Sequence, residues 1–258
     1  MFVVVPAGLR LVDGVAWLSR LWLIAAVPGA LSLVLPRGLA ATLLAVAYAL
    51  VTAVLAALGA ARFLKRRSIA PRELAVLTAM VTPSIAGSSL VAERAGYPLM
   101  GFDLDVLLLT VAHFHYTGFA AALIAGMVSR AVPSKAANAA ALSVPGGTAL
   151  VFLGYFTGDW VKLAGAIVLT AGMWLVAWVT WQQIRPTATD PLTRLLFGVS
   201  AVVLFGTMLL AISWALGEAT GLPHLSLGWM AATHGLVNAF GFALCAILAW
   251  RRFAPTPI

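Results

Sequence analysis

The sequence of 258 residues has few charged side chains and only one cysteine. Asp, Glu, Lys and Arg make up 9% of it, whereas an ordinary soluble domain is about 25% charged. Cys245 stands alone, so the chain can form no internal disulfide and has neither a CxxC pair nor an iron–sulfur framework. As a small residue within an apolar stretch, Cys245 most simply serves packing.

Several motifs that identify enzyme classes are also missing. The sequence has no glycine-rich phosphate loop and no strand-turn-helix serine nucleophile. It also has no DDxxD-like acidic motif, which metal-dependent chemistry on diphosphates requires. These absences disfavour prenyl transfer and the ionisation of a diphosphate.

Apolar residues, by contrast, are abundant. They make up 62% of the chain, whose mean hydropathy is +1.03. Runs of about 20 apolar residues, long enough to cross a hydrocarbon core of about 30 Å, recur along the whole length. The first run lacks an A-x-A-like cleavage site, so we expect a span rather than a removable signal peptide. We predict an all-α, polytopic bundle that forms a single transmembrane domain over residues 1–258. Its eight or so spans fall at 12–35, 39–63, 72–96, 103–129, 138–157, 160–184, 192–216 and 226–250.

The charged residues indicate how these spans are oriented. Most basic residues follow the second, fourth, sixth and last spans, and the loops on the opposite side carry fewer. Because cytoplasmic loops are enriched in Lys and Arg, we expect both termini in the cytoplasm. This placement accounts for the formal charge of +8 without a nucleic-acid partner. Five of the eight acidic residues lie near predicted external helix ends: Glu93, Asp103, Asp105, Asp159 and Glu218.

The stretch TVAHFHYTGFA, residues 110–120, places polar side chains deep in a predicted span. If this span enters from outside at Asp103, His113 lies roughly 15 Å deep at about 1.5 Å per residue, and His115 lies slightly deeper. In the last span, MAATHGLVNAFGFA places His234 roughly 12 Å deep by the same rise. Polar residues at mid-membrane are costly and by default indicate a functional site. We therefore predict a polar level that these three histidines share.

Helical spacing predicts which residues share a face in the fourth span. Asp103, Thr110 and Thr117 are spaced by seven, and His113 follows Thr110 by three, which forms one stripe from the outer surface inward. His115 lies about 200° around the helix from His113. An undistorted helix therefore cannot aim both histidines at one point. Either His115 is a helix contact or the helix is locally distorted and presents both.

Two further faces carry candidate residues. Asp105 and Tyr116 are eleven apart and nearly aligned on the fourth span. On the last span His234 and Asn238 share a face, so Asn238 could orient His234 or contact a ligand. Proline also predicts local distortion, because Pro83 and Pro145 should kink or break the third and fifth spans.

The sixth span contributes two deep tryptophans. Trp174 and Trp178 lie on one face, four residues apart. They either pack between helices, which we favour, or line a pocket. Their ring faces would then suit a cationic species.

Two motifs carry a resemblance to a known family. The segment VAHFHYTGFA, together with THGLVNAFGFA in the last span, resembles the YndJ-like family of bacterial integral membrane proteins. The resemblance implies a multi-pass protein of the bacterial cytoplasmic (inner) membrane, and it implies no reaction. It also implies a set of positions to consider: His113, His115, Tyr116, Gly118, His234, Gly235, Asn238 and Gly241.

The leading hypothesis is an intramembrane isomerase or cyclase. It would act on a lipophilic small molecule, a lipid or terpenoid, by acid–base chemistry of histidine and carboxylate: isomerisation, epoxide opening or cyclisation. Its partners would be this substrate and membrane lipid, and it would need no metal or other cofactor. The candidate catalytic residues are His113, His234, Tyr116, Asp103, Asn238, His115 and Glu93. The candidate substrate-binding residues are Trp174, Trp178, Thr110, Thr117 and Asp105.

Three alternatives stay open. Histidines on facing helices could bind haem or a metal, although no helix carries an HxxxH or HExxH spacing. Broken helices and midplane polar groups would suit a proton-coupled transporter, although the sequence has no clear inverted repeat. The histidines could also serve only as hydrogen-bonding contacts between helices.

Overall fold

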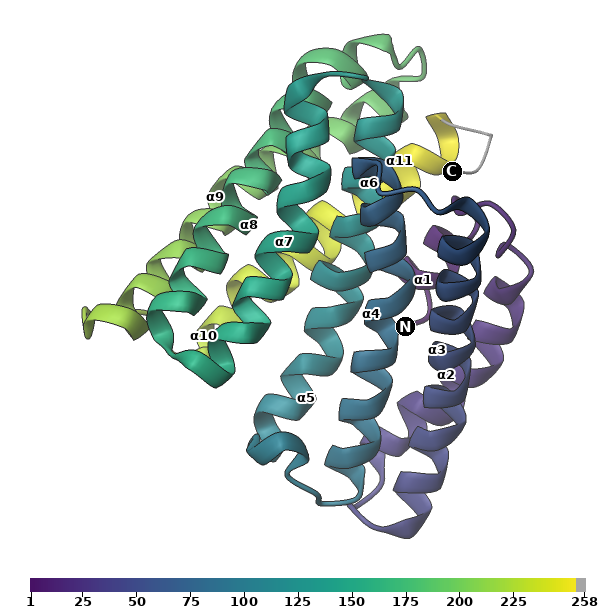
Figure 1. Cartoon of the computed structure of the whole chain (residues 1–258), viewed down its shortest axis with the longest axis vertical. Coiled ribbons are helices and arrows are strands. Elements are labelled where there is room, and N and C mark those ends of the chain that lie inside the picture. Colours follow the sequence, from purple (N-terminus) through teal and green to yellow (C-terminus); the bar gives the residue numbers. More distant parts are fainter. Residues whose placement is uncertain (254–258) are drawn as a thin grey trace. The chain divides into compact units, whose positions relative to one another are not determined.

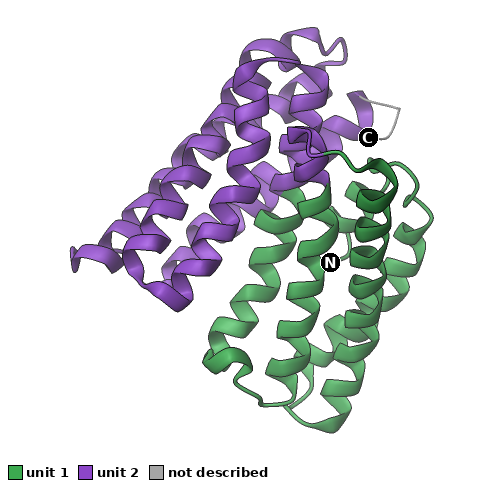
Figure 2. Cartoon of the chain, in the orientation of Figure 1, with its two compact units in different colours: residues 1–68, 77–120, 257–258 green, residues 69–76, 121–256 purple. Residues whose placement is uncertain are grey.

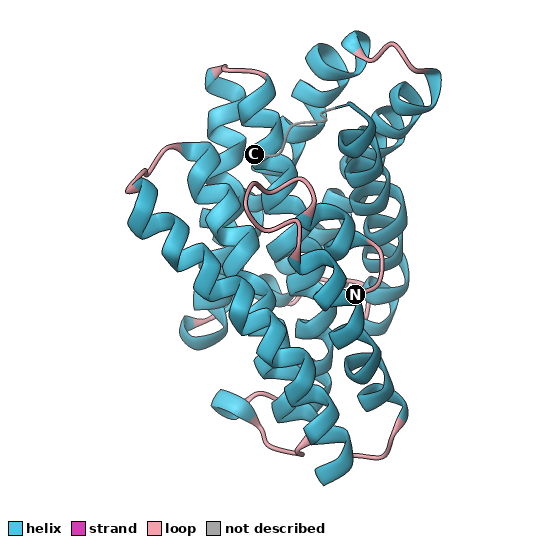
Figure 3. Cartoon of the chain, turned by 90° about the vertical axis from the view of Figure 1, so that its right-hand side faces the viewer, coloured by secondary structure: helices cyan, strands magenta, loops and turns pink. Residues whose placement is uncertain are grey.

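The computed structural model describes residues 1–253, and all regular structure in that range is helical (Figures 1 and 3). Short 3₁₀ segments occur at Leu99–Gly101 and Arg185–Thr187, and four segments are π-helical. The α-helices are α1 (Val4–Leu9), α2 (Leu18–Val34), α3 (Leu39–Arg66), α4 (Pro71–Arg94), α5 (Leu104–His113), α6 (Ala122–Ala131), α7 (Lys135–Thr157), α8 (Asp159–Val179), α9 (Pro191–Thr220), α10 (Leu227–Met230) and α11 (Cys245–Phe253). The π-helical segments are η2 (Phe114–Ala121), η3 (Thr180–Ile184), η5 (Ala231–Gly235) and η6 (Asn238–Leu244).

Seven continuous helices within residues 1–253 are long and apolar enough to cross a membrane. They are Leu39–Arg66, Pro71–Arg94, Leu104–Ala131, Lys135–Thr157, Asp159–Thr187, Pro191–Thr220 and Leu227–Phe253. Pro83 and Pro145 lie inside two of these helices, which continue through both positions. Neither proline therefore breaks its helix.

Seven of the eight predicted spans correspond to these helices, and the first predicted span does not. Residues 12–35 contain only α2, which has 17 residues. At 1.5 Å per residue this helix is about 26 Å long, shorter than the core of about 30 Å. The helix begins late because Gly14 has a φ of 78°, which turns the chain between α1 and α2.

Other helix ends also follow from local chemistry. The Ser134 side chain accepts a hydrogen bond from the Ala137 N–H at the start of α7. Asp190 does the same for Thr193 at the start of α9, where Pro191 occupies the first position. Gly221 ends α9 in the left-handed region, with a φ of 75°.

The described chain divides into two compact units (Figure 2). Unit 1 comprises residues 1–68 and 77–120, and therefore holds α1 to α3, most of α4, α5 and most of η2. A Cβ atom on Gly87 would lie 2.4 Å from the Thr52 hydroxyl and 3.0 Å from the Ala49 Cα, so α4 packs directly on the α3 backbone. The fully buried large side chains of unit 1 include Trp22, Tyr48, Leu55, Met80, Leu90 and Leu107.

Unit 2 comprises residues 69–76 and 121–253 of the described chain, and its α7 and α8 lie side by side (Figure 1). A Cβ atom on Gly147 would lie 2.6 Å from the Leu169 nitrogen, and one on Gly165 would lie 2.5 Å from the Val151 nitrogen. Small residues at such positions let membrane helices approach closely. The prediction of a single transmembrane domain over residues 1–258 stays a prediction.

Candidate functional site

Both segments that the sequence singled out form π-helix. η2 contains His115 and Tyr116, and the last long helix contains η5 and η6, which carry His234 and Asn238 respectively. The π-helix is rare and is frequently found at functional sites. Its wider turns also change the angle between successive side chains. The fourth span is therefore locally distorted at the motif.

Despite the distortion, His113 and His115 have different surroundings. His113 ends α5 and is exposed, with its ring edge-to-face with the Phe114 ring at 6.0 Å. His115 is only 3% exposed. The two side chains therefore face different surroundings, as the angle between them predicts.

His115 is held by hydrogen bonds at both ring nitrogens. Its Nδ1 lies 2.5 Å from the Val111 carbonyl oxygen, which can only accept, so Nδ1 carries the proton and donates it. Nε2 is therefore the acceptor, and the Tyr48 hydroxyl of α3 donates to it. The two rings stack at 5.8 Å, and Trp22 of α2 stands edge-on to His115 at 6.3 Å. This buried group joins three elements of unit 1 and leaves His115 no free nitrogen for a substrate.

The other predicted residues of the fourth span are more accessible than His115. Asp103 and Asp105 are exposed, and Asp105 lies 4.0 Å from the Arg37 guanidinium. Thr110 is half-buried and donates its hydroxyl to the Val106 carbonyl at 2.7 Å, within its own helix. The remaining two predicted residues of this segment, Tyr116 and Thr117, are also half-buried.

Glu93 belongs to a buried ionic cluster in unit 1. Its carboxylate is fully buried, lies 2.9 Å from the Arg37 Nε and is paired with the Arg94 guanidinium. Arg94 also donates to the carbonyls of Ser32 and Leu35 at 3.1 and 3.2 Å. The cluster thus ties the end of α4 to the end of α2. This geometry favours a structural role for Glu93 and lends no support to its predicted catalytic one.

In unit 2 the structure brings His234 and Asn238 together with Thr207 of α9. His234 Nδ1 lies 2.7 Å from the Thr207 carbonyl oxygen and therefore donates to it. The Asn238 amide nitrogen lies against the ring, 3.3 Å from Nε2, the nitrogen left to accept, and 3.4 Å from Nδ1. The Asn238 carbonyl oxygen accepts from the Thr207 hydroxyl at 2.8 Å. One threonine thus positions both polar residues of the last span.

The His234 group differs from His115 in its accessibility. His234 and Asn238 are half-buried. Neighbouring apolar side chains of the same helix are exposed: Leu236, Val237 and Phe240. The helix that carries the half-buried His234 therefore also exposes apolar side chains. His113 and His115 belong to unit 1 and His234 to unit 2, and their shared depth stays a prediction.

Trp174 packs against another helix, whereas Trp178 is exposed. Trp174 stacks on Phe205 of α9, with ring centroids 6.1 Å apart and planes inclined by 18°. Trp178 is 53% exposed. This arrangement favours packing for Trp174 and places Trp178 on the surface. The substrate-binding role of both tryptophans stays a prediction.

Sequence reasoning missed two residues that hydrogen-bond to the histidines of these motifs. Tyr48 and Thr207 are polar residues within long apolar runs on α3 and α9, and no motif marks either one. A polar residue at mid-span was the available signal. As for metals, no group of three or more His, Cys, Asp or Glu residues within 1–253 is arranged to hold an ion.

Comparisons with known proteins show what the chain resembles. A family model described as YndJ-like protein matches residues 1–242. The uncharacterized membrane protein YndJ of Bacillus subtilis (strain 168) is 25% identical over 181 residues, which cover 69% of this chain and 33% of that protein. The chain thus matches only about a third of that relative's length. No solved structure matches the chain.

The family match includes the whole of the first motif and all but the last residue of the second. The seven long apolar helices within residues 1–253 and the bacterial relative agree on a multi-pass membrane protein. The predicted resemblance is confirmed by the match to the family model, and the chain belongs to the YndJ-like family.

Proposed function

We propose that this protein is an intramembrane enzyme of the bacterial cytoplasmic membrane that acts on a lipophilic small molecule, with His234 as its general base. The observation that carries this proposal is the 2.7 Å distance between His234 Nδ1 and the Thr207 carbonyl oxygen, from which the tautomer follows. Because Nδ1 donates to the Thr207 carbonyl, Nε2 is the basic nitrogen. A base whose proton-accepting atom is already oriented meets the first requirement of acid–base catalysis.

Asn238 supports this role as a positioning residue. Its amide lies against the imidazole, and its own carbonyl is held by the Thr207 hydroxyl. An amide 3.3 Å away is a weak donor that a substrate can displace. Asn238 can therefore orient the ring in the resting protein without consuming the basicity of Nε2.

The surroundings of His234 support a lipophilic substrate. His234 is half-buried on a membrane-crossing helix that also exposes the apolar side chains of Leu236, Val237 and Phe240. A molecule dissolved in the lipid could thus approach this helix without passing through water. His234 would take a proton from one carbon of the substrate onto Nε2 and deliver a proton from Nε2 to another carbon, which is an isomerisation that balances with one base. Exchange of the Nε2 proton with water between the two steps would place a solvent hydrogen in the product.

The proposal can be tested without knowing the substrate. Proton transfer at carbon exchanges hydrogen with solvent, so a bacterial lipid extract incubated in D₂O with the protein in nanodiscs should gain deuterium in one compound. We expect His234→Gln to reduce this incorporation by about 10²- to 10⁴-fold, the usual contribution of a general base. Mass spectrometry of the extract measures the incorporation.

The matched control is His224→Gln, because His224 is a histidine outside the site that pairs with Glu218 at 3.3 Å. This variant should exchange deuterium as fast as the unchanged protein. The thermal unfolding midpoint of His234→Gln is measured in parallel to show that it is folded. Equal incorporation by the folded His234→Gln variant, or none above protein-free nanodiscs, would contradict the proposal.

The remaining alternatives have different readouts. A haem protein would show Soret absorbance after purification, and a metalloprotein would show a stoichiometric metal in elemental analysis. A proton-coupled transporter would require sealed proteoliposomes and a gradient, whereas an isomerase turns over in open nanodiscs. Deuterium incorporation in open nanodiscs therefore separates the enzyme from all three.

A further inference from the structure

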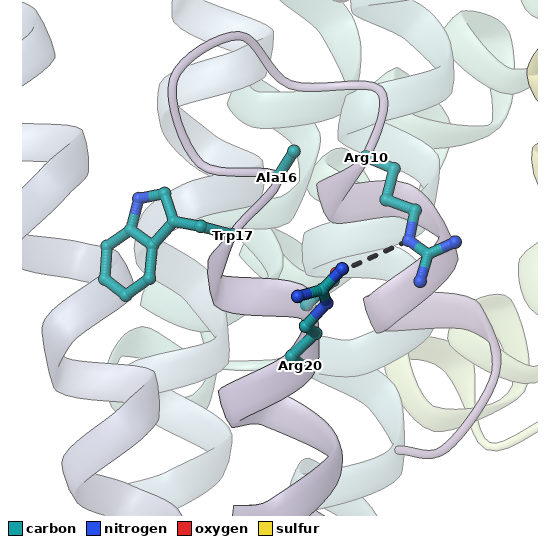
Figure 4. A pocket seen from close by; sticks show the side chains of 5 residues that line it. Arg10, Ala16, Trp17 and Arg20 are labelled. Atoms are coloured by element: carbon teal, nitrogen blue, oxygen red, sulfur yellow. Dashed lines mark hydrogen bonds between the residues drawn. The ribbon is translucent and has the colours of Figure 1, made fainter.

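The connection between α1 and α2 forms a pocket that is separate from both histidine groups. Its volume is about 600 Å³, and it is lined by Arg10, Ala16, Trp17, Ser19 and Arg20 (Figure 4). The Gly14 turn brings the end of α1 back beside the start of α2. The loop is held by the Trp17 indole N–H, which donates to the Gly14 carbonyl at 3.2 Å.

Two guanidinium groups converge on this pocket. Figure 4 shows the side chains of Arg10 and Arg20 pointing toward the same space from the two helices. Arg10 Nε lies 3.4 Å from the hydroxyl oxygen of the buried Ser19. The five lining residues include no carboxylate. Like charges brought together in this way favour an anion between them.

The acidic residue of the same loop is engaged elsewhere. Asp13 pairs with Arg66 of α3 at 3.4 Å and is not among the lining residues. The pocket therefore keeps its positive charge. Planar guanidinium groups match the oxygens of a phosphate in pairs, and they bind it with charge-assisted hydrogen bonds. The chemistry of the lining thus suits an oxyanion such as a phosphate group.

The position of the pocket selects a phosphate that is carried by a lipid. Trp17 is 53% exposed beside it, and tryptophan is enriched at the headgroup level of membranes. Leu21 and Ile24 are exposed further along α2 and offer an apolar track for an acyl chain. From these observations we propose that the α1–α2 pocket binds the phosphate headgroup of an anionic membrane lipid. The proposal does not depend on the function proposed for His234.

The test measures binding of phosphatidylglycerol to the full chain in neutral detergent, with phosphatidylcholine, whose choline cation offsets the charge of its phosphate, as the comparison lipid. The unchanged protein should bind phosphatidylglycerol and show a raised thermal unfolding midpoint in its presence. Because each hydrogen bond to a charged group contributes about 1.5–3 kcal/mol, Arg10→Gln/Arg20→Gln should weaken this binding by at least about tenfold. Native mass spectrometry gives the bound fraction for each lipid.

The control is Lys65→Gln/Arg67→Gln, which removes the same charge from residues outside the pocket. It should bind phosphatidylglycerol within about twofold of the unchanged protein, a difference that is small beside tenfold. If the double arginine variant does not fold, Arg20→Gln alone replaces it, because the Arg20 side chain is exposed. Equal loss of binding in the control and the pocket variant would overturn the site. Protection by inorganic phosphate as strong as that by the lipid would overturn the lipid assignment.

Discussion

His115 and His234 share the same helix type and the same Nδ1 hydrogen bond, but their surroundings differ. Each lies in a π-helical segment of a membrane-crossing helix, and each donates its Nδ1 proton to a backbone carbonyl. They differ at Nε2. In His115 this nitrogen accepts from the buried Tyr48 hydroxyl, whereas in His234 it lies 3.3 Å from the amide of a half-buried Asn238.

The difference shows that a motif alone does not decide the role of a membrane histidine. A buried imidazole with two satisfied nitrogens rigidifies the helices around it, because any loss leaves a polar atom unpaired in a low dielectric. A half-buried imidazole with one weakly occupied nitrogen keeps that nitrogen available. We call the first arrangement closed and the second open. The predictions below test this division.

The largest effect is expected at Glu93, which has the same closed character as His115. Glu93→Ala would leave Arg94 buried and without its carboxylate, and breaking a buried ion pair costs about 3–5 kcal/mol. Thermal unfolding in detergent measures the loss. Asp13→Ala, which breaks the exposed pair with Arg66, should change the unfolding midpoint very little. Similar midpoints for both variants would contradict the closed assignment of Glu93.

The next effect concerns the glycines that bring each histidine segment against its neighbouring helix. A Cβ atom on Gly118 would lie 2.6 Å from the Thr82 side chain, and one on Gly241 would lie 2.7 Å from the Val203 side chain. Overpacking of this kind costs about 1–3 kcal/mol. We therefore expect Gly118→Ala and Gly241→Ala each to lower the unfolding midpoint.

Gly235 is the matched control for these glycines. A Cβ atom there would meet only the Met230 carbonyl oxygen, at 3.8 Å. Gly235→Ala should therefore be neutral or slightly stabilising, because alanine favours the helix more than glycine does. If Gly235→Ala were as destabilising as Gly241→Ala, close helix approach would not explain these glycines.

Tyr48→Phe tests the closed histidine directly. The ring stays in place, but Nε2 of His115 loses its donor, and leaving a buried polar atom unsatisfied costs about 1–3 kcal/mol. We expect the lower end of this range, because the phenyl ring preserves the stacking on His115. Deuterium incorporation per folded molecule should not change. The control is Tyr97→Phe, at an exposed tyrosine. Loss of turnover in Tyr48→Phe without loss of stability would instead indicate that His115 is the reactive histidine.

The sequence predicted the existence of the helices better than their ends. Apolar runs of about 20 residues require only length and composition to recognise. The first run misled because Gly14, in its left-handed conformation, ends the continuity between α1 and α2. A single glycine in an apolar stretch is weak evidence for a turn, since glycine is frequent in membrane helices.

The site was predictable only in part, for a related reason. Periodicity within one helix places Asn238 on the face of His234 and turns His115 away from His113. It cannot show which polar residue of another helix lies opposite, so Tyr48 and Thr207 emerged only from the structure. The same limit applies to Glu93, where the sequence could not place the Arg94 guanidinium on the carboxylate.

The smallest effect is expected at Asp190, which separates exposure from the number of hydrogen bonds. Asp190 accepts from the Thr193 amide and hydroxyl and pairs with Arg252 at 2.9 Å, and yet its side chain is 43% exposed. The Thr193 bonds, followed by Arg252, lower the pKa of this carboxyl from 3.8 to about 2. A lowered pKa stabilises the fold above pH about 4, and this stabilisation is lost as the pH falls from about 4 to about 2.

The substitution Asp190→Asn removes this stabilisation but keeps a good helix cap. Because solvent screens the interactions of this exposed carboxyl, we expect at neutral pH a smaller decrease in the unfolding midpoint than Tyr48→Phe gives. The difference between Asp190→Asn and the unchanged protein should vanish as the pH approaches 2. Should Asp190→Asn prove more destabilising than Tyr48→Phe at pH 7, the count of hydrogen bonds rather than burial would set the importance of a polar group. The division into closed and open sites would then fail.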